Sequence, residues 1–334
     1  MERDLHVVVG ATGGTGTALV HELRRRGHRV RAVNRGGTGR HGADVEVAAG
    51  DATDAASMRE VCRGATAVYN CVNPPFAAWT STFPAAVRGT IEGAAAAGAR
   101  LVFADDTWMY GRVDAPMTES TPARPVGGKG VLRAWLAEAV LAAHARGTCP
   151  TVIGRAGELY GPLVESVLGA GLFGAAVAGR PPRWIGALDR PLTPTYIGDF
   201  ARVLATLGEE PDDRAADPLL GRVWHVPHPA PLTGRELVGL VRAGTGSRAP
   251  LLRIGSPLAR RLAAVWPLAR EGAELVYQFE MPFVVDGSAF AARFPGFDPV
   301  PWADGVARTL AWYRDPVPSP DAAAAPGRER VVTG

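Results

Sequence analysis

One lysine stands apart among the charged residues of this 334-residue chain. Lysine and arginine together number 36, and Lys129, in the stretch PVGGKGVLRA, is the single lysine. Arg133 follows four residues later, so a helix that begins near Lys129 places both side chains on one face. A neighbouring guanidinium and partial burial both disfavour a charged amine. We therefore expect Lys129 to exchange its proton readily, as a general acid or base does and as arginine cannot.

A glycine-rich turn near the N-terminus has the pattern of a phosphate-binding loop. The segment GATGGTG spaces Gly10, Gly13 and Gly16 three residues apart, between an apolar run and an amphipathic stretch. Glycines allow a tight turn and let a pyrophosphate approach the helix N-terminus, where free N–H groups and the helix dipole favour anions. Because a predicted strand precedes the turn and a predicted helix follows it, the pattern indicates a dinucleotide site.

Strands and helices alternate around these residues. We predict strands at 5–11, 28–35, 45–51, 67–73, 100–106, 150–156 and 223–229, and helices at 15–27, 55–64, 84–99 and 132–147. This alternation predicts an α/β protein with a Rossmann-type doubly wound parallel sheet and a smaller C-terminal substrate-binding lobe.

The predicted organisation has three parts. Residues 1–156, with 191–229 returning to them, form the dinucleotide-binding domain. Residues 157–190 and 230–313, which contain proline-rich turns and isolated helices, form the lobe. Residues 315–334 are poor in bulky apolar side chains, so we expect a disordered tail.

Composition and charge limit the partners. Hydrophobic residues make up 47% of the chain, charged residues 21%, and the formal net charge is +3, as in ordinary soluble proteins. The arginines are not interleaved with aromatic residues and no apolar run spans a bilayer, so we expect no nucleic-acid or membrane partner. The histidines and the three cysteines have no metal-like spacing. An apolar strand at residue 5 predicts no signal peptide, which suits a reducing cytoplasm.

The chain resembles the extended short-chain dehydrogenase/reductase superfamily, in its NAD-dependent epimerase/dehydratase-like branch, from residue 5 to about residue 313. The glycine loop, GDATD at 50–54, LYGP at 159–162 and PLTPTYIGDFARVL at 191–204 carry the resemblance. It implies that Asp51 contacts the adenine. The cofactor-binding residues that it implies are Gly10, Thr12, Gly13, Gly14, Thr15, Gly16, Asn34, Arg35, Asp51, Ala52 and Arg133.

The end of the second strand bears on the choice of cofactor. Family members that prefer NAD place an acid there, whereas this chain has Asn34 and Arg35. No carboxylate repels a 2′-phosphate, and an arginine can bind one, so we expect NADP(H) to be preferred, with NAD(H) as a possible substitute. The alternative is that Arg35 is solvated and that other residues set the specificity.

The resemblance also marks a departure at the catalytic positions. Family members carry a Ser or Thr at the end of the fifth strand, then a Tyr and a Lys four residues apart at the start of the next helix. These positions fall on Asp106, Lys129 and Arg133. The resemblance thus implies that Lys129 replaces the tyrosine as proton donor, that Arg133 binds the ribose, and that Asp106 shares a proton with Lys129 or contacts a cationic substrate group. Tyr110 is a stand-in donor or a packed tyrosine; Lys129 as a surface lysine and Asp106 as a turn cap also stay open.

The loops after the fourth and fifth strands face the nicotinamide in this fold, and here they are rich in aromatic residues. They predict a bulky, largely apolar small-molecule substrate. The residues expected to contact it are Asn73, Phe76, Trp79, Thr107, Trp108, Glu158 and Tyr160.

Three functions remain open from the sequence. The first is an NADPH-dependent oxidoreductase that reduces a C=O, C=N or activated C=C bond. The second is a redox-neutral isomerase, epimerase or cyclase that uses Asp106 and Lys129, and the third is a non-catalytic NADP-binding regulator. A homodimer through the helices that flank the fourth and fifth strands is common in such proteins.

Overall fold

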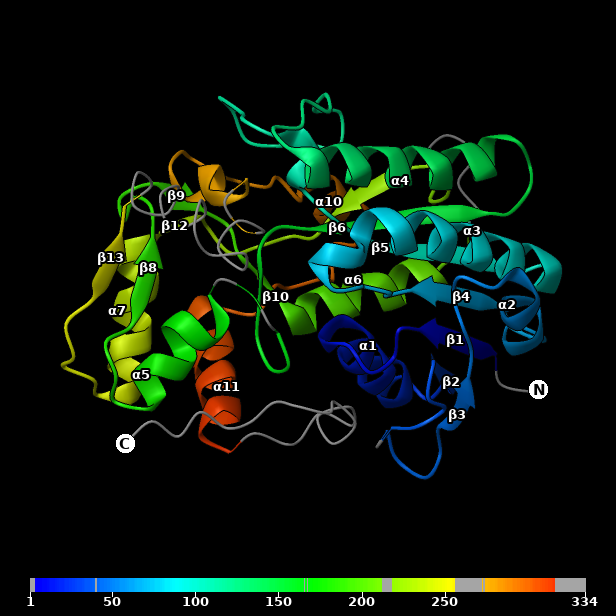
Figure 1. The fold of residues 1–334 in the computed structure, drawn as a ribbon, viewed down its shortest axis with the longest axis horizontal. Helices are drawn as coiled ribbons and strands as arrows, with labels where there is room; N and C mark the ends of the chain where they lie inside the picture. The colour runs from blue at the N-terminus through cyan, green and yellow to red at the C-terminus, as the bar shows by residue number, and fades with distance from the viewer. Residues whose placement is uncertain are drawn as a thin grey trace.

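A seven-stranded parallel sheet forms the centre of the protein (Figure 1). The structure is a computed structural model that describes residues 4–39, 41–164, 166, 168–211, 218–255, 272 and 274–315. The strand order is β11-β6-β5-β4-β1-β2-β3. The strands are β1 (Leu5–Val9), β2 (Arg29–Asn34), β3 (Glu46–Ala49), β4 (Ala67–Asn70), β5 (Arg100–Asp106), β6 (Thr151–Ala156) and β11 (Val223–His225). All neighbours pair in parallel, which confirms the predicted doubly wound sheet.

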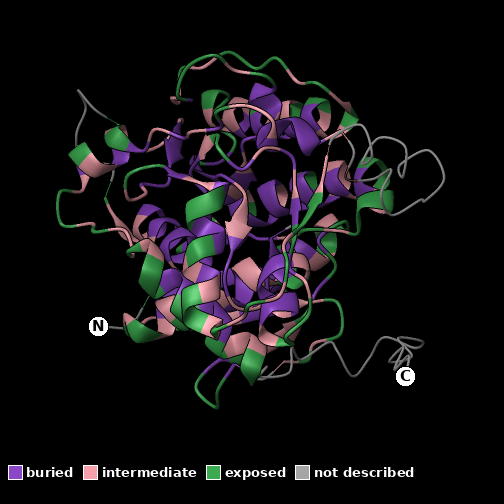
Figure 2. Cartoon of the chain, turned by 90° about the vertical axis from the view of Figure 1, so that its left-hand side faces the viewer, coloured by how far each residue is buried: buried purple, intermediate pink, exposed green. Residues whose placement is uncertain are grey.

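Helices cover both faces of this sheet. One face packs against α2 (Ala55–Val61), α3 (Trp79–Ala97) and α4 (Gly128–Ala145), and the other against α1 (Gly14–Arg25) and α6 (Ile197–Glu209). Alternate residues of β1 show the result, because Val7 belongs to the first core and Val8 to the second. Strands buried on both faces are apolar throughout rather than alternating. Figure 2 shows the buried interior and the exposed outer faces of the helices.

Two helices begin earlier than the sequence predicts. A proline often starts a helix, and on that basis residue 84 was the expected start of α3. The helix begins at Trp79 instead, with Pro84 inside it, because the Trp79 ring is buried and donates its Nε1–H to Pro74 O at 2.8 Å. Helix α4 begins at Gly128 rather than at residue 132, so Lys129 lies in its first turn.

The C-terminal lobe has its own apolar core, which includes Phe173, Trp184 and Leu310. Its short strand pairs are β7 (Leu159–Tyr160) with β10 (Thr195–Tyr196), β9 (Pro191–Leu192) with β12 (Leu232–Thr233), and β8 (Arg183–Ile185) with β13 (Leu252–Ile254). Its helices are α5 (Ala175–Val177), α7 (Gly234–Thr245), α11 (Trp302–Arg314) and the 3-10 turn η4 (Val276–Phe279), with a π-helical turn at Gly169–Gly174.

One segment predicted in the lobe packs on the sheet. Helix α10 (Ser288–Arg293) places Phe290 against Trp224 of β11, with ring centroids 6.2 Å apart. The predicted tail at 315–334 lies outside the described residues, apart from Asp315 at the end of α11.

Close packing of α2 and α3 generates a stability prediction. A Cβ on Gly89 of α3 would lie 2.1 Å from Ala52 O, whereas a Cβ on Gly239 of α7 would meet no atom within 4 Å. We expect Gly89→Ala to lower the free energy of unfolding by about 1–3 kcal/mol through overpacking. Gly239→Ala, the matched control, should raise it by about 0.5–1 kcal/mol through helix propensity. Urea denaturation measures both, and equal shifts for the two variants would contradict the packing argument.

Candidate functional site

The glycine loop forms a tight turn at the carboxyl end of β1. Gly10 has φ +83°, and its N–H donates to Val33 O at 3.0 Å. A Cβ on Gly16 would lie 2.2 Å from Gly10 O, so only glycine fits there. Within the described residues, no side chain caps the N-terminus of α1 and its first turn holds no acidic residue. Its N–H groups are therefore suited to bind an anion, as a pyrophosphate requires.

A second segment covers this loop, and the sequence gave no warning of it. Leu163 follows β7 and adopts φ 61°, which is unusual for a residue with a side chain. Its carbonyl oxygen lies 2.6 Å from where a Cβ of Gly14 would be. The glycine at position 14 therefore serves packing against the chain after β7 as well as access to the loop.

The predicted adenosine end is formed by the loops after β2 and β3. Asn34 Oδ1 accepts from Gly36 N at 3.0 Å and from Thr38 N at 3.3 Å, so this side chain shapes its own loop. Asp51 Oδ1 accepts from the N–H and the hydroxyl of Thr53, and these bonds hold the pKa of Asp51 below its usual value, with a smaller contribution from Arg35. Arg35 is exposed and lies near enough to Asp51 for that effect.

Two adjacent carboxylates end β5. Arg133 of α4 donates its Nε–H to Asp106 Oδ2 at 2.5 Å, and the same nitrogen lies 3.5 Å from Asp105 Oδ1. Arg155 stands opposite Asp105 on β6 and donates to its Oδ2 at 2.9 Å. Burial raises the pKa of Asp106, Arg133 opposes that rise, and Asp105 adds to it.

Lys129 lies one turn from Arg133 but has a different partner from the one expected. Its Nζ donates to Glu274 Oε1 at 2.7 Å and lies 5.0 Å from the Phe76 ring centroid. We expected Asp106 to face Lys129. The structure instead pairs Asp106 with Arg133, because the guanidinium one turn further along α4 reaches the end of β5. A carboxylate beside an amine stabilises its charged form, so Glu274 acts against the easy loss of the proton that Lys129 was predicted to show.

Tyr110 is packed and bonded inside the protein. His225 Nδ1 lies 3.1 Å from the Asp286 carbonyl, which can only accept, so Nδ1 carries the proton. Burial lowers the pKa of His225 to about 3, so the ring is neutral and its Nε2 accepts from the Tyr110 hydroxyl at 2.7 Å. Arg155 Nη1 in turn donates to Tyr110 OH at 2.6 Å. The proton of Tyr110 is thus directed to His225, as expected of a packed tyrosine rather than of a donor to substrate.

Aromatic side chains gather above the two arginines and carboxylates. The rings of Trp79 and Trp108 stack with centroids 5.5 Å apart, and Phe76 meets Trp79 edge-on at 5.1 Å. The Arg133 guanidinium lies 5.4 Å from the Trp79 centroid. Phe76 is 38% exposed and Trp79 only 3%, so Phe76 is the member of this group that an approaching molecule meets.

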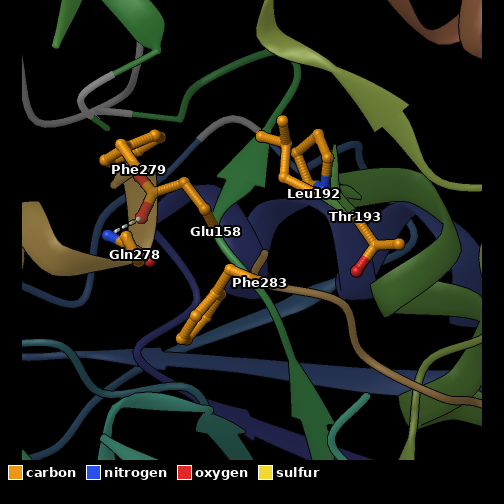
Figure 3. A pocket seen from close by; sticks show the side chains of 7 residues that line it. Glu158, Leu192, Thr193, Gln278, Phe279 and Phe283 are labelled. Carbon is orange, nitrogen blue, oxygen red and sulfur yellow. Dashed lines mark hydrogen bonds between the residues drawn. The ribbon is translucent and has the colours of Figure 1, made fainter. Parts of the chain in front are cut away.

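A small cavity lies where the lobe meets the end of β6 (Figure 3). Its volume is about 10 Å³, room for one water molecule. Gln278 donates its Nε2–H to Glu158 Oε2 at 3.2 Å on one side, and Phe279 and Phe283 line the remainder with Leu192, Thr193 and Pro194.

The other predicted substrate residues do not all lie together. Asn73 is exposed and Trp108 half-buried, whereas Thr107 is completely buried. Tyr160 is 1% exposed inside the lobe, where its ring stacks on Phe173 with centroids 6.0 Å apart. Sequence reasoning did not single out Glu274, Arg155, His225 or Gln278, because each meets its partner only through the tertiary fold.

Two further searches concern the described residues alone. No helix in that part of the chain has the length and apolar character needed to cross a membrane. Nor does any group of three or more His, Cys, Asp or Glu side chains there lie close enough together to hold a metal ion.

The parallel sheet, the glycine turn after β1 and the uncapped start of α1 define a dinucleotide-binding protein of the Rossmann type. The profile of the NAD dependent epimerase/dehydratase family matches residues 6–220. The chain therefore belongs to this family, in agreement with the resemblance to extended short-chain dehydrogenases/reductases. No curated protein matches it in sequence.

Solved structures share the fold over almost the whole chain. DesIV, a dTDP-glucose 4,6-dehydratase from Streptomyces venezuelae solved with NAD, is 21% identical, with TM-score 0.73 over 93% of this chain and 97% of that one. UDP-glucuronic acid 4-epimerase from Bacillus cereus, solved with NAD, is 15% identical, with TM-score 0.74 over 93% and 98%. MoeE5 in complex with UDP-glucose and NAD is 24% identical, with TM-score 0.71 over 93% and 98%. At these identities the likeness extends to the fold alone.

Proposed function

We propose that this protein is an NADPH-dependent reductase of a C=O, C=N or activated C=C bond in a bulky small molecule, with Lys129 as the proton donor. The observation that carries the proposal is the Lys129 amine, held charged by Glu274 beside Phe76 and one turn before Arg133. A charged amine is the acid form that donation requires.

The cofactor end of the proposal rests on the glycine turn and the start of α1. When bound, a nicotinamide dinucleotide supplies the hydride. Gly13, Gly14 and Thr15 would hold its pyrophosphate, Asp51 and Ala52 its adenine, and Arg133 its ribose. Within the described residues Arg133 Nη1 is buried without a hydrogen-bond partner, which fits a donor that awaits a hydroxyl.

The chain's own residues must provide the proton for the reduced group. Lys129 is 11% exposed at its side chain, so its proton can be renewed from solvent. Donation to the substrate oxygen or nitrogen leaves a neutral amine beside Glu274, whose carboxylate favours rapid reprotonation. Phe76 and the half-buried Trp108 offer apolar contact to the substrate, which supports a bulky apolar molecule.

A redox-neutral reaction is the second candidate. The printed names of similar structures include an epimerase and a dehydratase solved with NAD, and this favours it. Turnover of substrate without net oxidation of NADPH would support this reading against ours. Binding of NADPH without any turnover would support a regulator instead.

Lys129→Arg tests the proton donor most directly. Arginine keeps a positive charge for Glu274 but does not release its proton at working pH. We expect Lys129→Arg and Lys129→Ala both to lower kcat about 100-fold or more, the range that a general acid supplies, with the Kd for NADPH changed less than about threefold. The assay is substrate-dependent oxidation of NADPH with aryl ketones, cyclic imines and enones. Arg112→Ala, an exposed cation near the same loops, is the matched control. A loss of less than threefold in Lys129→Arg would leave the amine only an ion-pairing role.

Arg35 is the proposed binder of the 2′-phosphate. A charge-assisted hydrogen bond contributes about 1.5–3 kcal/mol, so Arg35→Ala should weaken NADPH binding about 10-fold or more and leave NADH binding almost unchanged. Arg63→Ala, exposed and paired with Glu60 elsewhere on the surface, is the control. Isothermal titration with both reduced cofactors measures the effect. If the unaltered protein binds NADH as tightly as NADPH, the proposed preference is wrong.

We also propose a homodimer through α4. Val131 and Trp135, one turn apart on this helix, are 57% and 45% exposed. Neighbouring large apolar side chains on a surface often mark an interface. Sedimentation should show a dimer that Trp135→Asp converts to a monomer, whereas Leu252→Asp in the lobe leaves it intact. A monomeric unaltered protein would contradict this proposal.

A further inference from the structure

Arg133 stands between two carboxylates and is bonded to one of them. Its Nε lies 2.5 Å from Asp106 Oδ2 and 3.5 Å from Asp105 Oδ1. Among the described residues, neither Asp105 Oδ1 nor Arg133 Nη1 has a hydrogen-bond partner, and both atoms are buried. A small rotation of the guanidinium would therefore exchange Asp106 for Asp105. The protein needs something that decides between these two arrangements.

Arg155 neutralises the competing carboxylate. Two of its nitrogens, Nε and Nη2, each lie 2.9 Å from Asp105 Oδ2, and the residue is 5% exposed. Its third nitrogen donates to Tyr110 OH, whose proton goes to His225 Nε2. The guanidinium is thus held from β5, from the turn η2 (Trp108–Tyr110) and, through Tyr110, from β11.

We propose that Arg155 is a positioning residue that keeps Arg133 on Asp106 by satisfying the charge of Asp105. The inference rests on the proposed function only in giving the Asp106–Arg133 pair a place at the reacting end of the site. Without Arg155, Asp105 would be a buried charge with no bonded cation, and Arg133 is the nearest guanidinium able to move to it. The orientation of Asp106 then depends on a residue that does not touch it.

The charged and titratable groups around the pair come from several elements. Tyr277 of η4 lies close enough to Asp106 for that carboxylate to raise the pKa of the phenol further, in addition to burial. Groups facing Asp106 or Asp105 are Arg133 from α4, Arg155 from β6, Tyr110 from η2 and Tyr277 from η4, and Glu119 and His225 surround Tyr110.

The test compares Arg155→Met with the charge-neutral double variant Asp105→Asn/Arg155→Met. In crystals of Arg155→Met we expect Arg133 bonded to Asp105, with the Asp106 bond broken. Carbon-13 NMR of the side-chain carboxyls, assigned with Asp106→Asn, should then show the pKa of Asp106 raised by about one unit or more. In the double variant no carboxylate competes, so Arg133 should stay on Asp106 and the pKa should return to within about 0.3 unit of the original.

Arg155→Lys keeps the charge, so it should leave Arg133 on Asp106 although one amine cannot reproduce all three bonds. Arg202→Met, which breaks the Asp199–Arg202 pair in another part of the protein, controls for a general loss of stability. It should leave the pKa of Asp106 unchanged.

Either of two results overturns the proposal: Arg133 remains on Asp106 in folded Arg155→Met, or it leaves Asp106 in the double variant. If Arg155→Met does not fold, the double variant still decides, because its neutral pair leaves no unpaired buried charge to prevent folding. These readouts require no turnover, so they stand apart from a failure of the proposed reductase activity. If that activity is present, Arg155→Met should lower kcat about 10-fold while the KM for NADPH changes little.

Discussion

Asp105 and Asp106 place two negative charges side by side in the interior, at the point where β5 ends. Burial of even one unpaired carboxylate is costly, so two of them require two cations that arrive from different directions. Arg133 comes from α4 and Arg155 from β6. This requirement ties the two faces of the site together, because the helix and the neighbouring strand must both hold their register for the charges to cancel. Tyr110 and His225 extend the same network to the edge strand β11.

The second constraint joins the lobe to the sheet. Glu274 bonds the amine of Lys129, and Tyr277 donates its hydroxyl proton to Trp108 O at 3.4 Å. Gly127 permits the first contact, because a Cβ there would lie 1.8 Å from Glu274 Oε2. The only lysine of the chain is thus held by the lobe at the start of α4. Its chemistry depends on where the segment 274–279 lies, as well as on its neighbours in the helix.

How far the sequence predicts each part depends on the range of the interaction. The glycine turn is specified by neighbouring residues, and all seven sheet strands occur within their predicted ranges because apolar runs and turn residues are local signals. The starts of α3 and α4 were placed too late, by five and four residues, since Trp79 and Lys129 gain their partners from the tertiary fold. The pairing of charges was the least predictable feature. Asp106 was expected to face Lys129, and spacing along a helix could not show that Arg133 reaches it first.

By itself, the sequence determined the doubly wound sheet, the phosphate-binding turn and the absence of the usual tyrosine and lysine pair, because strand periodicity, glycine spacing and residue identity are all written along the chain. Only the tertiary structure decided which cation meets which carboxylate. Lys129 and Glu274 are separated by 145 positions, and Asp105 and Arg155 by 50. Such partners are chosen by the packing of α4, β6 and the lobe around β5, and by the need to leave no buried charge unpaired.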